Sequence, residues 1–473
     1  MNPSLKANIK SALKSLSIDP NNLREFLMKA RVLGLRYSNH QLENFVKKEV
    51  KKLQSDLGFP PTPSPRYNVG VVWEADGTFF WLEQAKKTSK TMAEIIYLPR
   101  SLFNDAWKMI MKGYTTGAQL GEAPLDRYYR SEFSSQREVF RSYCKRVIKA
   151  LKKLYQIDVF VLPKFNDDWI TDLIRTLKES NEKVVINDRE VLSTVARMKV
   201  YPPIIRKHLD FEVDALCVAS DHHKEFFTKS NYPPSKITVT GKLNSDYWFR
   251  SDLWRDRAEI NSLLDPKRSL ILYFSFGPKT YLNFFYGDEI RDWASLAKDY
   301  HEILLDTVKS YPDKIQIAYK SGGKPHRDYF EGFDRFAREI KEFGQKDTLV
   351  PLDSRYSSLD LARSSDIIIG FMTSGLIEAM FTQNPILSGG WGSLYDDIGK
   401  TLVPYEESGA LYFCRSKEQM KDLLRTCITT KENLVDPDMK MRRKKFIEKY
   451  FSKADGRVGA RLLAEIDRVH RRN

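Results

Sequence analysis

The segment 357–386, SSLDLARSSDIIIGFMTSGLIEAMFTQNPI, contains the signals of a helix, a strand and a second helix in succession. Ser357 is a good N-cap for the first helix, and the apolar run at 366–370 has the length of a buried strand. Thr373 and Ser374 then open the second helix, which ends before an Asn-Pro pair. Because strands that alternate with helices form βαβ units, this segment predicts part of a parallel sheet.

The same alternation of short apolar runs and longer amphipathic stretches extends over most of the chain. A first series of predicted strands comprises residues 69–73, 95–98, 157–162, 184–186, 215–219 and 237–239. A second series comprises residues 270–274, 315–319, 348–351, 366–370, 385–387 and 411–413. A charged stretch without strand signals, 244–267, separates the two series. The sequence therefore predicts an α/β protein with two doubly wound, Rossmann-like domains.

Both ends of the chain predict helices outside these two domains. Near the N-terminus, apolar residues from Leu42 to Leu57 recur at helical spacing. The proline-rich run at 60–65 cannot continue a helix and predicts a stiff extended spacer. The predicted division is a helical extension (1–59), a linker (60–65), an N-terminal domain (66–246), a second linker (247–267), a C-terminal domain (268–436) and C-terminal helices (437–473).

The composition fits a cytoplasmic protein with more than one hydrophobic core. The chain has 473 residues, of which 42% are hydrophobic, and this length is too great for a single core. Its four cysteines are far apart and form no Cys-x-x-Cys pair, which predicts neither disulfides nor a zinc site. No apolar run is long enough to span a bilayer, and the first residues do not have the pattern of a secretory signal.

The net charge of +15, from 77 Lys and Arg against 62 Asp and Glu, indicates an anionic partner. The basic run 442–445 stands beside the apolar residues Met441, Phe446 and Phe451, a combination that suits an anionic membrane surface. Solvated helix faces are the alternative. No zinc-finger, RNP or basic-zipper pattern is present, so nucleic acid is not the expected partner. We therefore expect peripheral association with the inner face of the cell membrane.

The turn after the strand at 366–370 is the first candidate binding site. Thr373, Ser374 and Gly375 present hydroxyl and N–H groups at a helix N-terminus, where the helix dipole favours a phosphate. Glu378 lies one turn inside that helix and can accept hydrogen bonds from a ribose diol. The alternative is that Thr373 and Ser374 only cap the helix and Glu378 only balances its dipole. The preferred interpretation is a nucleotide site.

Two further elements follow predicted strands and carry positive charge. Lys320, Lys324 and His326 flank a glycine pair, so that the backbone can approach a phosphate that these side chains neutralise. Gly277 and Lys279 follow the first strand of the second series, at the sheet edge where doubly wound proteins bind ligands. A solvated group of lysines with an incidental histidine is the alternative for the first element.

Several stretches resemble GT-B glycosyltransferases, especially those that make bacterial surface polysaccharides. Residues 365–386 resemble their donor site, and residues 235–246 resemble the end of their N-terminal domain, also in the related UDP-sugar 2-epimerases. Residues 319–326 resemble their basic Lys…His element, and residues 455–461 resemble the tail of surface-polymer transferases such as glycerophosphotransferases. Together these similarities cover roughly residues 150–470.

The resemblance implies two facing domains that transfer a sugar from a UDP- or CMP-linked donor to a glycan or lipid-linked acceptor, without a separate cofactor. His326 would then act on the leaving phosphate. An inverting transfer needs a base, and Asp76, beside Glu74 at the end of the first strand, is the first candidate. An Asp-Gly pair is also ordinary turn chemistry. Asp188 and Arg189 form the alternative acceptor-side pair.

A metal-dependent mechanism is not expected. The only Asp-x-Asp pattern, Asp436-Pro437-Asp438, opens a predicted helix and is better explained as a cap. The sequence also lacks a P-loop and a Gly-x-Ser-x-Gly elbow.

Three other functions fit parts of the sequence. A UDP-sugar 2-epimerase would share the fold, but those enzymes carry a paired glutamate where this chain has only Glu378. A CDP-polyol phosphate transferase would suit the basic surface and the C-terminal similarity. A membrane-associated scaffold that keeps the fold is the non-enzymatic alternative, and the intact Thr373, Ser374, Glu378 and His326 count against it.

Overall fold

The computed structural model describes residues 38–472 except 63, 74–78, 90, 92, 112–123, 166–167, 189–193, 277–292, 321–332, 345–346, 354–355 and 431–433. Contacts group the chain into two compact units. Unit 1 comprises Met1–Trp73, Met92–Tyr114 and Tyr129–Val184, and unit 2 comprises Glu74–Thr91, Thr115–Tyr128 and Val185–Asn473. The domain ranges expected from the sequence follow a different division and stay predictions.

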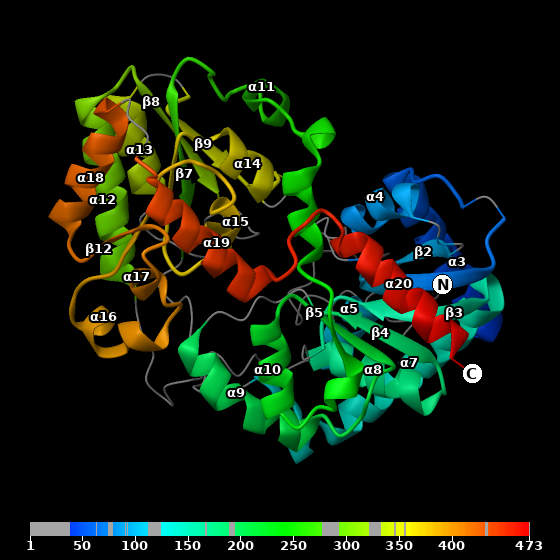
Figure 1. The fold of residues 1–473 in the computed structure, drawn as a ribbon. Helices are drawn as coiled ribbons and strands as arrows, with labels where there is room; N and C mark the ends of the chain where they lie inside the picture. Colours follow the sequence, from blue (N-terminus) through cyan, green and yellow to red (C-terminus); the bar gives the residue numbers. More distant parts are fainter. Residues whose placement is uncertain are drawn as a thin grey trace, which may run out of the picture. The chain divides into compact units, whose positions relative to one another are not determined.

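The strands form two six-stranded sheets (Figure 1). The first contains β1 (Tyr67–Trp73), β2 (Ala93–Pro99), β3 (Ile157–Leu162), β4 (Lys183–Asn187), β5 (Ala215–Val218) and β6 (Ile237–Val239). The second contains β7 (Ser269–Phe274), β8 (Ile315–Lys320), β9 (Leu349–Leu352), β10 (Ile367–Gly370), β11 (Ile386–Gly389) and β12 (Tyr412–Cys414). Every strand pair whose register is described is parallel. The predicted α/β class with two doubly wound sheets is confirmed.

The strand order of each sheet locates the point where a ligand is expected. The second sheet has the order β12-β11-β10-β7-β8-β9, so the direction of winding reverses between β7 and β10. The first sheet has the order β2-β1-β3-β4-β5-β6 and reverses between β1 and β3. In open parallel sheets, ligands bind beyond the carboxyl ends of the strands at this reversal. For the second sheet, that edge is formed by the ends of β7 and β10.

The helix expected from the apolar spacing between Leu42 and Leu57 is confirmed in unit 1. Its helices are α3 (Asn39–Leu57), α5 (Ser101–Ile110), α7 (Ser134–Tyr155), α8 (Asp168–Glu179) and the 3-10 helix η3 (Ser131–Phe133). Helix α3 buries Leu42, Val46 and Val50 and packs on α7 and β2. It begins with a capping box at Ser38 and ends at Gly58, whose φ of 62° favours glycine. Residues 1–37 of the predicted extension lie outside the described residues.

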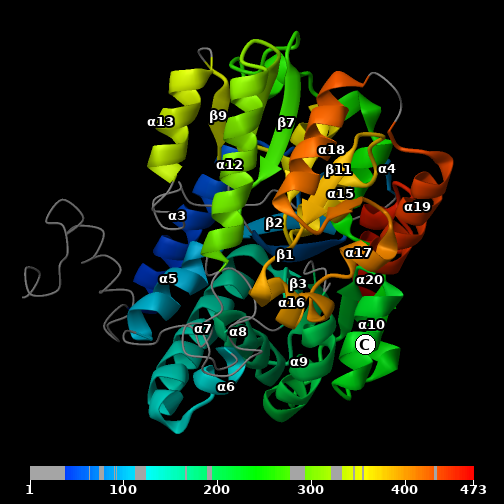
Figure 2. The same cartoon turned by 90° about the vertical axis from the view of Figure 1, so that its left-hand side faces the viewer.

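Helices cover both faces of the second sheet in unit 2. Figures 1 and 2 show α12 (Ala294–Ser310), α13 (Phe333–Phe343) and α18 (Lys417–Thr429) on one face, with α14 (Ser358–Ser364) and α15 (Ser374–Ala379) on the other. The other helices are α4 (Phe80–Thr88), α6 (Pro124–Tyr128), α9 (Val195–His208), α10 (Asp221–Lys229), α11 (Arg257–Ile260), α16 (Ser393–Ile398), α17 (Tyr405–Ser408), α19 (Pro437–Phe451), α20 (Val458–Arg471), η4 (Pro234–Lys236), η5 (Leu243–Phe249), η6 (Ser251–Leu253) and η9 (Gly399–Thr401).

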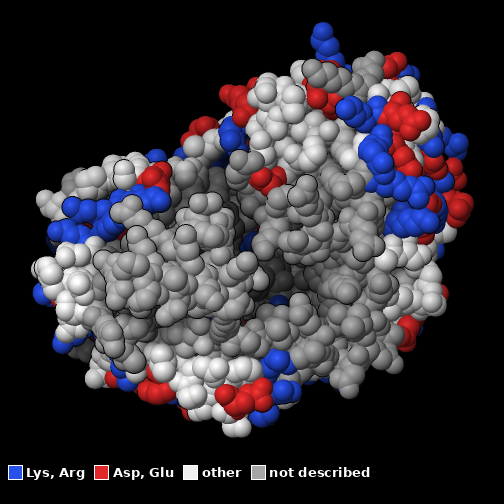
Figure 3. Space-filling model, turned by 180° about the vertical axis from the view of Figure 1, so that it is seen from behind, with Lys and Arg blue, Asp and Glu red and all other residues white. Residues whose placement is uncertain are grey.

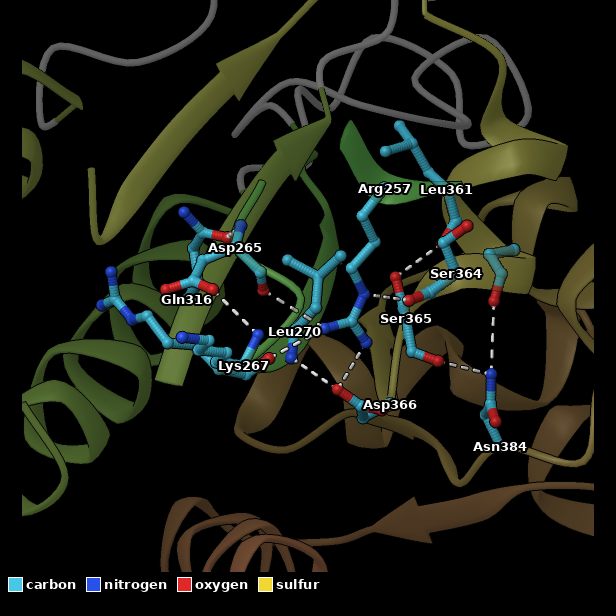
Figure 4. Close-up of polar contacts among 12 residues, drawn as sticks. Arg257, Asp265, Lys267, Leu270, Gln316, Leu361, Ser364, Ser365, Asp366 and Asn384 are labelled. Carbon is cyan, nitrogen blue, oxygen red and sulfur yellow. Dashed lines mark hydrogen bonds and ion pairs between the residues drawn. The ribbon is translucent and has the colours of Figure 1, made fainter. Parts of the chain in front are cut away.

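A polar cluster fixes the amino ends of β7 and β10, opposite the expected ligand edge (Figure 4). The Arg257 guanidinium pairs with the Asp366 carboxylate at 2.7 Å, and the same carboxylate oxygen accepts the Leu270 N–H at 2.7 Å. The Asn384 side-chain amide donates to the Ser365 carbonyl at 2.5 Å. Asp366 and Asn384 belong to the stretch that resembles a donor site, but their contacts stabilise the sheet.

Two other stretches that carry the resemblance bind each other. The Asp246 carboxylate accepts the backbone N–H groups of Val458 at 3.0 Å and Gly459 at 2.8 Å, at the start of α20. The Arg461 guanidinium donates to the Thr240 carbonyl at 2.7 Å. Helix α20 also packs on α4 and β5. These stretches therefore anchor the C-terminal helix, which confirms the helical ending expected from the sequence.

Candidate functional site

Glu378 is the centre of a polar cluster on unit 2. The residue belongs to α15, which directly follows β10, and only 7% of its surface is exposed. Its Oε1 atom accepts hydrogen bonds from the Lys242 ammonium at 2.8 Å and from the Asn244 side-chain amide at 3.1 Å. Its Oε2 atom accepts the Ser358 hydroxyl at 3.3 Å. A carboxylate has about four acceptor positions, so Oε2 keeps capacity for one more donor.

The partners of Glu378 come from segments distant in sequence. Lys242 and Asn244 follow β6, and Ser358 is the first residue of α14. The Lys242 ammonium also lies 4.8 Å from the centre of the Phe451 ring at the end of α19, a cation–π contact. The buried Oδ1 atom of Asn244 has no hydrogen-bond partner among the described residues. A hydroxyl or amide of a bound ligand could donate a hydrogen bond to this open acceptor beside Glu378.

The sequence analysis did not assign Lys242, Asn244 or Ser358 to the site. Each of them stood in a stretch singled out for its resemblance or its capping pattern, but the contacts with Glu378 span 134 and 136 positions for Asn244 and Lys242. Local spacing contains no information on such distant pairs. The sequence contained one signal for these two residues: Lys242 and Asn244 come shortly after the strand β6.

Lys320 places a second cation at the carboxyl edge of the same sheet. Its ammonium donates to the Asp353 carbonyl at 2.8 Å, and its own carbonyl accepts the backbone N–H of Ser275 at 3.0 Å. Burial lowers the pKa of Lys320, while the negative charges of Asp353 and Glu378 counteract this effect. Lys320 therefore lies within the electrostatic field of Glu378, and its role toward a phosphate stays a prediction.

The turn between β10 and α15 has structural roles that the sequence analysis gave only as the alternative. The Thr373 hydroxyl accepts the Gly375 N–H at 3.2 Å and so caps α15, as the alternative proposed. A Cβ atom on Gly375 would stand 2.9 Å from the Phe274 ring, so close packing also requires this glycine. Ser374 is exposed, and its hydroxyl has no partner in the described part of the chain. Ser374 is thus the residue of this turn whose side chain can contact a ligand.

Backbone strain marks the same turn. Met372 is buried, yet it adopts a φ of 50° in the left-handed region, which a bulky side chain rarely occupies. Strained residues of this kind concentrate at binding sites, where the surrounding packing holds them. The Tyr405 hydroxyl donates to the Thr373 carbonyl at 2.7 Å and supports this conformation.

Most other predicted site residues lie outside the described residues. These are Glu74, Asp76, Arg189, Gly277, Lys279, Lys324 and His326. Asp188 is described and is 3% exposed, with its backbone N–H donating to the Cys217 carbonyl at 2.9 Å. The roles assigned to all of these residues stay predictions.

The Asp-x-Asp pattern is a helix cap, as expected. The Asp436 carboxylate accepts the Met439 N–H at 2.6 Å, and Pro437 is the first residue of α19. Across the described ranges, no three His, Cys, Asp or Glu side chains are grouped as a metal site would require. Metal independence itself stays a prediction.

The expected membrane-binding cluster at 441–451 is partly wrong. Arg443 is 2% exposed and donates to the backbone carbonyls of Ala410, Thr382 and Asn384. Phe446 and Phe451 are buried in the core and cannot enter a membrane, because the helical period of α19 turns them inward.

The face drawn in Figure 3 gives no simple support for a single anionic partner. On the face drawn in Figure 3, the described Lys and Arg side chains lie in separate groups with Asp and Glu side chains beside them. Within the described parts of the chain, no helix is both long and apolar enough to cross a bilayer.

Comparison with known proteins identifies the fold. No protein-family model matches the sequence, and no curated protein is similar to it in sequence. Solved structures do match: a UDP-N-acetylglucosamine 2-epimerase has a TM-score of 0.52 at 14% identity, covering 85% of this chain and 96% of that chain. A putative UDP-N-acetylglucosamine 2-epimerase from Listeria monocytogenes has the same score and identity, with 85% and 95% covered. The MnaA–UDP co-structure from S. aureus has a TM-score of 0.50 at 13% identity, with 85% and 96% covered.

These similarities define the class of fold. The two parallel sheets with their surrounding helices form a GT-B-like α/β fold shared with the 2-epimerases. The fold relation expected from the sequence is therefore confirmed.

Proposed function

We propose that this protein binds a UDP-linked sugar at the carboxyl edge of its second sheet and transfers the sugar to an acceptor hydroxyl. The observation that carries the proposal is the buried Glu378, held by Lys242, Asn244 and Ser358 beside the reversal of strand order. This is the edge where open parallel sheets bind nucleotides. The matching structures, which include a 2-epimerase and the MnaA–UDP co-structure, support the nucleotide.

Each described group has a part in this binding. The free capacity of Glu378 Oε2 and the open Oδ1 of Asn244 would accept hydrogen bonds from ribose hydroxyls. The Ser374 hydroxyl and the Lys320 ammonium would contact the diphosphate. The nucleotide sugar is a substrate, and we propose no separate cofactor.

The chemistry proposed is displacement at the anomeric carbon. The acceptor oxygen forms a bond to this carbon while the bond to the nucleotide phosphate breaks, and its electron pair leaves with the phosphate. Asp76 is proposed to take the acceptor proton, and His326 to stabilise the charge on the leaving phosphate. The proposed acceptor is a glycan or a lipid-linked glycan, which the protein would meet at the inner face of a membrane.

Epimerisation is the second candidate function, because the matching structures include 2-epimerases. Those enzymes resemble this chain at the donor site but carry a paired glutamate there. The residue before Glu378 is Ile377, which is completely buried in the core. A second carboxylate is therefore missing from this helix, which favours transfer over epimerisation.

The test combines binding with product analysis. Thermal unfolding is measured with UDP, CMP, GDP and CDP, because a ligand of the native state raises the midpoint. UDP is expected to give the largest shift. Incubation with UDP-N-acetylglucosamine then separates the two functions, since an epimerase changes the sugar at C2 without any acceptor. A midpoint that no nucleotide shifts would exclude both, and a shift with CDP alone would favour a polyol-phosphate transferase.

Replacing Glu378 by Gln is expected to weaken nucleotide binding by about 1–3 kcal/mol, because a charge-assisted hydrogen bond to the ribose is lost. The Gln side chain keeps an acceptor for Lys242 and Asn244, so the fold is expected to survive. Binding is measured by isothermal titration. Glu418→Gln, an exposed acid in the first turn of α18, is the control. Equal affinity of both variants would contradict the role of Glu378.

Transfer activity is expected to survive EDTA. No metal is needed in this proposal, because the one Asp-x-Asp pattern caps α19 and the proposed site neutralises phosphate with Lys320 and other side chains. Activity is measured as sugar transfer before and after chelation. A loss that manganese or magnesium restores would show that a metal ion takes part.

A further inference from the structure

A groove on unit 2 combines positive charge with an apolar wall. It has a volume of about 330 Å³ and lies between the residues that follow α15 and the helix α19. Lys440, Lys444 and Lys453 line it together with a single acid, Glu448, and the apolar side chains include Phe381 and Ile447. This volume falls in the range of small-molecule sites, about 300–1,000 Å³.

The lysines of the groove have free donor capacity. In the described part of the chain, Lys440 and Lys444 are exposed and have no ion-pair partner. Lys453 is exposed and donates one hydrogen bond to the Val239 carbonyl at 3.4 Å, while an ammonium group has three donors. Glu448 is likewise without an ion-pair partner among the described residues, so the lysines are not neutralised in pairs.

Arg443 gives the groove a fixed positive floor. Its guanidinium donates to three backbone carbonyls at 2.9–3.0 Å and therefore cannot move away from the wall. Burial lowers the pKa of Arg443 to about 10, so the group is still charged at neutral pH. A fixed charge together with exposed lysines in one groove attracts anions.

We propose that this groove is an anion site for a phosphate ester with a small apolar group next to the phosphate. The lysines supply charge-assisted hydrogen bonds to the phosphate oxygens, and Phe381 with Ile447 supplies contact for the carbon atoms. Two sources offer this chemistry, a soluble phosphate ester and the headgroup of an anionic phospholipid. The proposal does not depend on the nucleotide site, because the groove residues do not include Glu378 or its partners.

The matched variants lie on one helix. The test variant is Lys440→Gln with Lys444→Gln, and the control is Lys445→Gln with Lys449→Gln, which removes two exposed lysines of α19 that do not line the groove. Lys and Gln have similar helix propensity, so both doubles are expected to fold like the wild type. Both change the net charge of the protein by the same amount.

Binding of glycerol 1-phosphate to the full chain is measured by isothermal titration. Sedimentation is measured with phosphatidylcholine vesicles that do or do not contain phosphatidylglycerol. The test double is expected to lose about tenfold or more in affinity for the ligand that binds, because two charge-assisted bonds are lost. The control double is expected to stay within about twofold. Retention of binding in Glu378→Gln would separate the groove from the nucleotide site.

The pattern of binding assigns the source. Titration with glycerol 1-phosphate and no vesicle binding supports a soluble ester, whereas sedimentation that needs phosphatidylglycerol supports a headgroup. Equal losses in the two doubles would overturn the proposal, because they indicate general attraction by surface charge. Absence of binding to both glycerol 1-phosphate and anionic vesicles in the wild type would overturn it as well.

Discussion

Arg443→Ala is expected to lower the free energy of unfolding by about 3 kcal/mol or more, since three carbonyls lose their donor and each loss costs at least about 1 kcal/mol. The side chain is 2% exposed and donates to the carbonyls of Ala410, Thr382 and Asn384. Two of these carbonyls belong to the turn before β11 and the third lies just before β12, and the truncated side chain leaves no group that can replace the three bonds.

The stability of this variant is measured by urea unfolding, from the midpoint and the slope of the transition. Arg442→Ala is the matched control, because Arg442 is half-buried and donates one bond, to the Gly409 carbonyl at 2.8 Å. The control is expected to lose only about 0.5–1.5 kcal/mol. Similar losses in the two variants would contradict the structural role of Arg443.

The run 442–445 also shows what periodicity can and cannot predict. By composition it is a uniform basic cluster, and the sequence analysis interpreted it as a membrane-binding surface. Four of the five buried residues of α19 are Met439, Arg443, Phe446 and Tyr450, and their spacing of three and four residues is that of one helix face. Arg443 therefore stands at an apolar-face position, a signal that was available in the sequence. Its carbonyl partners were not, because they depend on the tertiary fold.

The strands could be predicted because each is a local apolar run bounded by turn residues. The helix caps at Ser357, Thr373 and Asp436 could also be predicted, because a cap needs only a hydroxyl or carboxylate at the right position. The partners of Glu378 could not, since Lys242 is 136 positions away. The position of Glu378 at the ligand edge followed from the strand–turn–helix pattern, whereas its hydrogen bonds required the fold.

The stretches that resemble surface-polysaccharide enzymes contain residues that anchor a helix and residues that lie at the proposed binding site. Asp246 and Arg461 stand in stretches that carry the resemblance, and both hold the C-terminal helix α20 in place. Glu378 and Lys320 stand in other such stretches and lie at the carboxyl edge of the sheet. A sequence pattern does not distinguish anchoring from binding, and the hydrogen bonds do. The proposed function therefore depends on the second group of residues.

His326→Ala is expected to lower the turnover of sugar transfer by roughly 10²–10³-fold, the loss typical of removing one fixed donor to a developing anion. His326 lies outside the described residues, six positions after Lys320, the last residue of β8. As the bond to the anomeric carbon breaks, negative charge grows on the nucleotide phosphate. A cation beside that phosphate consequently stabilises the transition state more than the bound substrate, and a nearby phosphate favours the protonated imidazole.

The expected signature is a fall in kcat that exceeds any rise in the donor KM, because the interaction strengthens only as the reaction proceeds. Steady-state kinetics with varied donor concentration measure both constants. His40→Ala is the control, since His40 is an exposed histidine of α3 and its change is expected to leave both constants as they are. A change in KM alone would make His326 a uniform binder of the donor. Unchanged constants would place His326 in a solvated basic turn, and the charge on the leaving phosphate would then have to be stabilised by Lys320 and Lys324.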